Sequence, residues 1–196
     1  MGFYQHGFSN RTPSGGGFSF VNDSSSPHLS GYFDCPTSGT TQSILYTGPL
    51  TDAPSSMPSG ATIVGLQVLA EVWTTVYGGS TTSAPNTAKD TTVELQKNGV
   101  LLTGYNVGAN AYLPSVVEPP YTIQYWGTPT SLYGTTWGQS DFENANTGVY
   151  FQFTVTAACR INLSNIVLRA WTPAVSTGNI DPKVRYWPGY SYQYQG

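Results

Sequence analysis

Alternation of apolar and polar residues predicts three strong β-strands. In IVGLQVLAEVW, every second position from Val64 to Val72 is apolar, whereas Gln67 and Glu71 belong to the other set. GVYFQFTVTA and SNIVLRAWTP show the same period of two. A period of two is typical of a half-buried strand, because successive side chains point to opposite faces. Pro173 cannot donate to a sheet hydrogen bond, so we expect the last strand to end there.

Weaker alternation predicts two further strands. Residues 91–97, TTVELQK, alternate and are followed directly by Asn98-Gly99. That dipeptide favours a β-hairpin, because both central residues of a type I′ turn need a positive φ. Residues 121–125, YTIQY, also alternate, and the rest of the stretch 103–147 is predicted to be loop.

Several amphipathic strands without a convincing helix predict an all-β fold. We expect an antiparallel β-sandwich, and a β-barrel built from the same strands remains an alternative. The 22 glycines, 14 prolines and 14% aromatic residues suit short strands joined by tight turns. The pattern divides the chain into a Gly/Ser-rich N-terminal arm (1–40), a β-sandwich domain (41–173) and an aromatic C-terminal arm (174–196).

Both predicted arms carry aromatic rings, which a free polar tail would lack. The last twelve residues, RYWPGYSYQYQG, contain five of them. Burial of a large apolar side chain stabilises by about 1.5–3 kcal/mol, so rings that dock together can offset the entropy of ordering an arm. We therefore expect the arms to pack on neighbouring subunits. The expected inter-subunit contacts are Phe3, Tyr4, Phe8, Tyr186, Trp187, Tyr190, Tyr192 and Tyr194.

The charge of the chain argues against several partners. Charged residues make up 9% of the sequence, the net charge is −3, and the seven Lys and Arg are scattered. Without a basic stripe to follow a phosphate backbone, we expect no nucleic-acid partner. No apolar stretch reaches the roughly 20 residues of a membrane span, and no secretory signal is recognised. We therefore expect assembly in the cytoplasm and no membrane partner.

Two features bear on metal binding and redox chemistry. Cys35 and Cys159 are the only cysteines. Without a secretory signal, two reduced and buried thiols are favoured, although a bridge between them is possible. The loop SDFENANTG, residues 140–148, is dense in oxygen ligands, but its spacing misses the EF-hand pattern and its residue types are those of any turn. We expect no metal and no cofactor.

The residues of a catalytic site are not recognisable. The chain has no G-x-S-x-G motif, and His6 and His28 both lie in the predicted N-terminal arm, where nothing would fix an imidazole. Glu71 and Glu94 lie on the polar sides of two strands, so a glycosidase-like carboxylate pair is conceivable. Nothing in the sequence marks a cleft around them. We expect no catalytic residues and a protein that is not an enzyme.

Aromatic residues gather in the middle of the chain. Tyr and Trp rings can stack on sugars, so Tyr125, Trp126, Tyr133 and Trp137 form a possible glycan or receptor surface. The alternative is that these rings fill the ends of the sandwich and the gaps between loops. That alternative is favoured for most of the rings.

Four segments resemble a known family. They are PSGATIVGLQV (58–68), VELQKNGV (93–100), TTWGQSDFENANTGVYFQF (135–153) and NIVLRAWTP (165–173). Their order resembles the small β-sandwich structural proteins of tailed-bacteriophage particles, of the capsid decoration or cement type. The resemblance covers about residues 57–173 and carries over no catalytic or ligand residue.

The resemblance implies a jelly-roll-like fold and a non-enzymatic structural role in a virion. In that role the arms would bind the major capsid protein or other virion proteins, and identical copies would form a homo-oligomer such as a trimer. The expected location is the virion, assembled in the host cytoplasm. The alternative is a module associated with the collar, tail or fibre that binds a receptor glycan.

Overall fold

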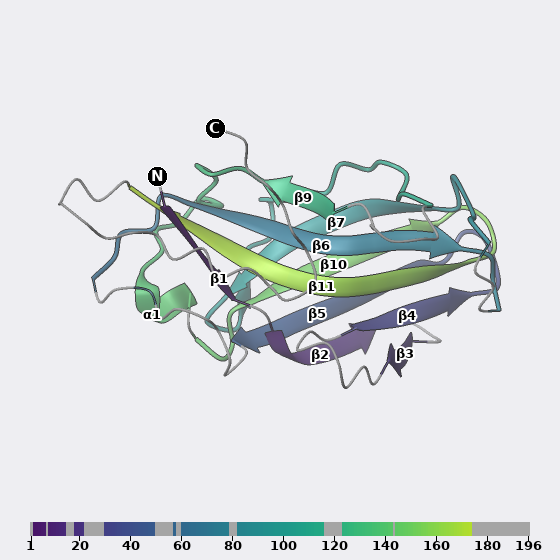
Figure 1. Cartoon of the computed structure of the whole chain (residues 1–196), viewed down its shortest axis with the longest axis horizontal. Helices are drawn as coiled ribbons and strands as arrows, with labels where there is room; N and C mark the ends of the chain where they lie inside the picture. The colour runs from purple at the N-terminus through teal and green to yellow at the C-terminus, as the bar shows by residue number, and fades with distance from the viewer. Residues whose placement is uncertain are drawn as a thin grey trace, which may run out of the picture.

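The fold is a sandwich of two antiparallel sheets, shown in Figure 1. This computed structural model describes residues 2–6, 8–14, 18–21, 30–49, 57, 60–78, 82–115, 123–142 and 144–173. Sheet A contains β3 (Phe18–Val21), β4 (Ser30–Cys35), β11 (Cys159–Thr172), β6 (Gly65–Thr75) and β9 (Ile123–Gly127) in that order, with β1 (Gly2–His6) also paired to β11. Sheet B contains β2 (Phe8–Ser14), β5 (Thr41–Pro49), β10 (Gly148–Val155), β7 (Ala88–Lys97) and β8 (Val100–Leu101) in that order.

The strand order is that of a jelly roll. From β4 to β11, sheet A has the order β4-β11-β6-β9 and sheet B the order β5-β10-β7-β8. The chain therefore crosses between the sheets at almost every connection, as in a double Greek key. The expected all-β, antiparallel, jelly-roll-like sandwich is confirmed. One short helix, α1 (Gln139–Phe142), interrupts the loop before β10.

The core lies between the sheets and follows the predicted alternation. The side chains of Val149, Phe151, Phe153 and Val155 all point inward and are almost completely buried. The ring of Phe151 stacks on that of Phe153 at 6.0 Å between centroids. Each such side chain stabilises the fold by about 1.5–3 kcal/mol when it is removed from water.

The N-terminal forty residues do not form a separate arm over their described part. β1, β3 and β4 belong to sheet A and β2 belongs to sheet B, so both sheets include residues from this region. Phe8, expected to contact a neighbouring subunit, is instead 4% exposed in the core of its own chain, with its ring 6.3 Å from that of Tyr46. The prediction of a separate arm was wrong because Gly- and Ser-rich segments lack the alternation that marks a strand. Their backbone groups can nevertheless pair with the edge of a sheet.

Other expected contact residues stay untested. The backbone of Phe3 and Tyr4 pairs with Trp171 and Ala170 in β11. The aromatic residues from Tyr186 to Tyr194 lie outside the described residues. Within the described part of the chain, no helix has the length and apolar character needed to cross a bilayer.

Candidate functional site

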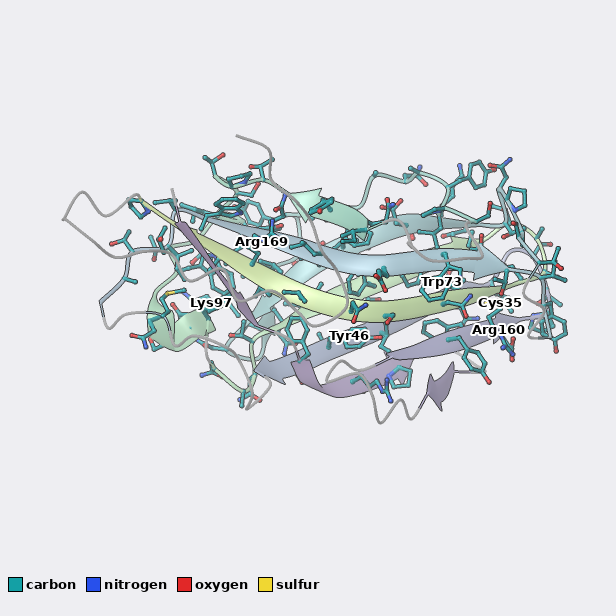
Figure 2. The ribbon with its side chains drawn as sticks, in the orientation of Figure 1. Cys35, Tyr46, Trp73, Lys97, Arg160 and Arg169 are labelled. Atoms are coloured by element: carbon teal, nitrogen blue, oxygen red, sulfur yellow. The ribbon has the colours of Figure 1, made fainter. Side chains whose placement is uncertain are left out.

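One outward surface combines aromatic rings with planar polar groups. We call it the outer face of sheet A, meaning the side chains of β4, β6, β9 and β11 that point away from sheet B. Its rings and polar groups are Tyr32, Asp34, Gln67, Glu71, Trp73, Tyr125, Arg160, Asn162, Arg169 and Trp171. Figure 2 shows Trp73 and Arg160 toward one end of this sheet and Arg169 nearer the other.

The register places three of these side chains in a row. Asn162 of β11 is paired with Tyr32 of β4 on one side and with Trp73 of β6 on the other. Side chains directly opposite in neighbouring strands lie about 4.5–5.5 Å apart at Cβ, so a carboxamide stands between two rings. The amide of Asn162 donates to the Thr75 hydroxyl at 3.3 Å, which helps to fix its orientation.

A stacked guanidinium flanks this row. Arg160 donates from Nε and from a terminal nitrogen to the two carboxylate oxygens of Asp34, both at 2.9 Å. Its guanidinium carbon lies 3.7 Å from the centroid of the Tyr32 ring. The hydrogen bonds with Asp34 raise the pKa of Arg160, so the guanidinium stays charged. The pair offers a flat, fixed surface with hydrogen-bonding edges.

At the other end of the outer face of sheet A, a second guanidinium lies beside a ring. Arg169 lies 5.7 Å from the Trp171 ring and donates to the Gln67 side chain at 3.5 Å. Burial lowers the pKa of Arg169. Tyr125 stands on β9 opposite Leu69 and is 54% exposed, which makes it the most accessible ring of the face.

A β-bulge shapes the centre of the face. Ser164 is paired with Glu71 and Val167 with Leu69, so Asn165 and Ile166 together oppose the single residue Ala70. Asn165 adopts a φ of 51°, in the left-handed region that asparagine tolerates. Bulges redirect side chains, and here the amide of Asn165 donates to Glu71 Oε2 at 2.7 Å.

Glu71 is therefore a buried carboxyl on an outward face. It is 4% exposed. Burial raises the pKa of Glu71, and the hydrogen bond from Asn165 opposes that rise. Glu71 stands on β6 two residues from Trp73, so the bulge and the acid lie next to the Tyr32–Asn162–Trp73 row within sheet A.

The four rings predicted as a glycan surface separate into two groups. Tyr125 lies on the outer face of sheet A, whereas Trp126, Tyr133 and Trp137 are 4–5% exposed. Trp126 points into the sandwich, 5.3 Å from the Phe151 ring. Trp137 donates its indole N–H to the carbonyl of Leu132 at 2.9 Å. These three rings fill the interior and the loop gaps, as the alternative interpretation expected.

The two glutamates considered as a carboxylate pair lie apart. Glu71 faces outward from sheet A, whereas Glu94, paired with Tyr150, faces outward from sheet B. The thickness of the sandwich lies between them, about 10 Å from sheet to sheet. This arrangement does not provide the facing carboxyl groups that glycoside hydrolysis requires.

The acidic loop is occupied by contacts within the chain. Asp141 forms an ion pair with Lys97 at 3.2 Å and accepts hydrogen bonds from Asn98 at 2.7 Å and from the backbone of Gly138 at 3.1 Å. Although burial acts in the opposite direction, these partners lower the pKa of Asp141. In the described part of the chain, no group of three or more His, Cys, Asp or Glu residues could hold a metal ion.

The opposite surface of the sandwich differs in character. Among the described strand residues of sheet B, the outward positions are mostly hydroxyls and amides, and Tyr150 is the one aromatic ring. Its hydroxyl accepts a hydrogen bond from Gln152 at 3.3 Å. The outer face of sheet A is the candidate functional site, because its strands bring rings and planar polar groups together in register.

Sequence reasoning missed most of this site. Glu71 was recognised on the polar side of a strand, but neither Glu71 nor Trp73 was connected with Tyr32, because Tyr32 was assigned to an arm. Arg160 and Asn162 belong to the first half of β11, which was not predicted as strand because the bulge at Asn165 breaks the alternation. A search for alternation on each side of a single-residue slip would have found them.

Comparisons with known proteins find fold likenesses at low similarity. No protein-family model matches the chain, and no curated protein matches it. The xylan-binding CBM22-1 domain of Paenibacillus barcinonensis Xyn10C aligns at 13% identity, over 87% of this chain and 94% of that one, with a TM-score of 0.41. The family 11 carbohydrate-binding module of Clostridium thermocellum Lic26A-Cel5E aligns at 10% identity, over 88% and 87%, with a TM-score of 0.36.

A third similar structure is described as an enzyme and not as a binding module. It is a putative glycoside hydrolase from Bacteroides vulgatus, which aligns at 10% identity over 76% of this chain and 75% of that one, with a TM-score of 0.35. Likeness at this level carries no argument about what this chain binds, and one architecture serves many functions.

Proposed function

We propose that this protein is a non-catalytic glycan-binding module that holds sugar on the outer face of sheet A. The observation that carries the proposal is the Tyr32–Asn162–Trp73 row, which places a carboxamide between two rings beside the stacked guanidinium of Arg160. The proposal depends on these residues and their geometry.

The chemistry of a sugar fits such a row. A pyranose presents C–H groups on its faces and hydroxyls around its rim. The C–H groups carry partial positive charge and are attracted to the negative face of an aromatic ring. The hydroxyls both donate and accept, so they match the carbonyl oxygen of Asn162, whose amide already donates to Thr75 and to the Trp73 carbonyl, and the donors of Arg160 that Asp34 does not occupy.

The charges on this face favour a ligand that is neutral overall. The guanidinium of Arg160 is already paired with Asp34, so little net charge remains for an anionic ligand. The expected contribution of each ring to binding is about 0.5–1.5 kcal/mol beyond the area it buries. We therefore expect several modest contacts and no single dominant one.

The place of such a module in a virus particle stays a prediction. Glycan binding agrees with the receptor-binding alternative that follows from the sequence resemblance. The decoration role would require contacts from the chain ends, and Phe8, one of the expected contact residues, is buried within its own chain. The proposed function does not depend on the identity of the particle.

A binding screen tests the proposal. The full chain would be titrated by calorimetry with soluble neutral oligosaccharides of glucose, xylose, mannose and galactose, and with one acidic polysaccharide. We expect saturable binding to at least one neutral sugar, and Trp73→Ala should reduce the affinity about 2–10-fold if one stacked ring is lost. Tyr150→Ala, which removes a ring from the outer face of sheet B, is the matched control and should bind normally. Absence of saturable binding across the panel, or equal losses in both variants, would overturn the proposal.

A further inference from the structure

The two cysteines lie directly opposite each other in sheet A. Cys35 is the last residue of β4 and is paired with Cys159, the first residue of β11. Both thiols are free, and both residues are 0% exposed. Figure 2 places Cys35 at the end of the sandwich that also carries Arg160. The expected burial of both thiols is therefore confirmed, and their pairing adds information that the sequence did not contain.

The backbone geometry of this pair is compatible with a disulfide. Opposite residues of antiparallel strands have Cα atoms about 4.5–5.5 Å apart, and a disulfide accepts Cα separations of about 4.4–6.8 Å. Both side chains are on the core side of the sheet, so their Cβ atoms point in the same direction. No strand needs to change register for the two sulfurs to meet.

The thiols also interact with each other before any bond is formed. The hydrogen bond with Cys35 lowers the pKa of Cys159, although burial acts in the opposite direction. The same hydrogen bond, together with burial, raises the pKa of Cys35. One thiol of such a pair can therefore ionise while its neighbour keeps a proton. An attacking thiolate beside a second thiol is the arrangement that thiol–disulfide exchange uses.

We propose that Cys35 and Cys159 are a dithiol modification site, which a small disulfide of the glutathione type oxidises to a cross-strand disulfide. In the first step the Cys159 thiolate attacks one sulfur of oxidised glutathione, an S–S bond to Cys159 forms, and one glutathione thiolate leaves. In the second step Cys35 loses its proton, attacks the Cys159 sulfur and displaces the second glutathione thiolate. The protein loses two hydrogens, and the oxidised glutathione is reduced to two thiols.

Access to the sulfurs requires local opening of the sheet. Neither cysteine has exposed surface, so the reagent reaches them only when β4 separates from β11. Among the described strands, β3 is the one that lies outside β4, and its four residues form the edge of the strand order. Local openings of this kind at a sheet edge cost less than global unfolding. The reaction is therefore expected to be slow in the native protein and fast during refolding.

The bond would connect distant parts of the chain. It joins the end of β4 to the start of the last strand and closes a loop of roughly 120 residues. A cross-link stabilises more when it closes a longer loop, because it removes more conformational entropy from the unfolded chain. It would also fix β4 beside β11, next to the Asp34–Arg160 pair of the candidate site. A reducing compartment would keep the thiols free, and a non-reducing environment would favour the bond.

Refolding of the full chain in defined redox buffers tests this inference. Reduced protein would be unfolded in urea and refolded with either reduced or oxidised glutathione. Intact mass, peptide mapping and the thermal midpoint would then be measured. With oxidised glutathione we expect the loss of two hydrogens, a Cys35–Cys159 linked peptide, and a rise in Tm on the order of 10 °C that a reductant reverses.

Two single variants serve as controls. Cys35→Ser and Cys159→Ser should each fail to show the redox-dependent shift in Tm, because neither can form the bond. If either variant fails to fold, the comparison of oxidised wild-type protein with and without reductant still shows whether the Cys35–Cys159 disulfide forms. A folded wild-type protein that retains two free thiols after oxidative refolding would overturn the inference. A stable glutathione adduct in place of the bond, or a fall in Tm on oxidation, would also overturn it.

Discussion

The indole N–H of Trp126 donates a hydrogen bond to Asp90 Oδ2 at 2.7 Å, and this bond links the two sheets. Trp126 belongs to β9 of sheet A and Asp90 to β7 of sheet B. The same carboxylate accepts from the backbone of Ala109 at 3.1 Å and of Ala111 at 2.8 Å. One buried acid thus orients the ring that spans the core and holds the loop that runs beside β7.

Loss of this carboxylate should destabilise the fold strongly. Asp90→Ala leaves the buried indole N–H of Trp126 without its acceptor, and such a loss costs about 1–3 kcal/mol. It also removes the acceptor of the backbone amides of Ala109 and Ala111, two exposed residues, so we expect the free energy of unfolding to fall by roughly 2 kcal/mol or more. Trp126→Phe removes one hydrogen bond and keeps a ring, so its cost should be clearly smaller. Urea denaturation followed by fluorescence measures both, and equal costs would contradict the assigned role of Asp90.

A close contact makes Gly127 sensitive to substitution. Its φ is 79°, and a Cβ at this position would lie 2.2 Å from the hydroxyl oxygen of Tyr133. Gly127→Ala therefore adds a steric clash to the backbone strain. Gly104→Ala is a matched control, because Gly104 has a φ of 93° and no atom lies within 4 Å of the place that a Cβ would occupy there.

We expect Gly104→Ala to cost about 1 kcal/mol from backbone strain alone, and Gly127→Ala to cost at least about 1–3 kcal/mol more. Thermal unfolding of both variants gives the comparison. Similar values for the two variants would show that the Tyr133 contact contributes nothing.

The buried carboxyl on the outer face of sheet A should make stability depend on pH. Burial raises the pKa of Glu71 above its ordinary value of 4.5, so the folded state holds the proton to higher pH than the unfolded state does. Between the two pKa values the folded state holds more protons than the unfolded state does. The stability of the folded state therefore falls as pH rises through this range. The penalty is absent below the unfolded pKa and complete above the folded pKa.

Glu71→Gln removes this titration and keeps an oxygen that can accept from Asn165. The variant should therefore gain stability relative to wild type as pH rises from about 4 to 7. Glu94→Gln, on the outer face of sheet B, is the control. Denaturation curves at several pH values measure the difference, and a constant difference across the range would argue against a raised pKa for Glu71.

The bidentate contact of Arg160 should matter more for binding than for stability. Arg160→Lys keeps the charge, but it loses the planar group that both pairs with Asp34 and covers the Tyr32 ring. Because the pair is partly exposed to solvent, we expect a change in unfolding free energy below about 1 kcal/mol. Glycan affinity should fall several-fold. Normal affinity in a stable Arg160→Lys variant would remove Arg160 from the proposed site.

The fold was predictable from the sequence wherever side-chain alternation was strong. β6 and β10 alternate cleanly, and β7 does so after a register irregularity at Thr91. The positive φ values of 49° at Asn98 and 88° at Gly99 confirm the hairpin turn expected from that dipeptide. β4 was missed because a segment of six residues that includes Gly31 and Asp34 has little strand propensity. Its place is determined by pairing with β11 and by burial of Phe33 and Cys35, and both are long-range effects.

The site was less predictable than the fold. Its residues come from four strands that are distant in the sequence, and only the register brings Tyr32, Asn162 and Trp73 into one row. Aromatic content alone pointed to the middle of the chain, where Trp126 and Trp137 proved to be buried. The burial of a ring depends on which face of its strand it occupies, and sequence assigns that face only where alternation is unbroken.

The most direct test of the proposed binding face is a map of amide and indole resonances during titration. Labelled full-length protein would be titrated with the neutral oligosaccharide that binds most tightly in calorimetry. We predict saturable shifts at the indole of Trp73 and at the amides around Tyr32 and Asn162, with little change around Tyr150 and Gln152. Shifts concentrated on the outer face of sheet B, with the Trp73 indole unmoved, would contradict the assignment of the binding face.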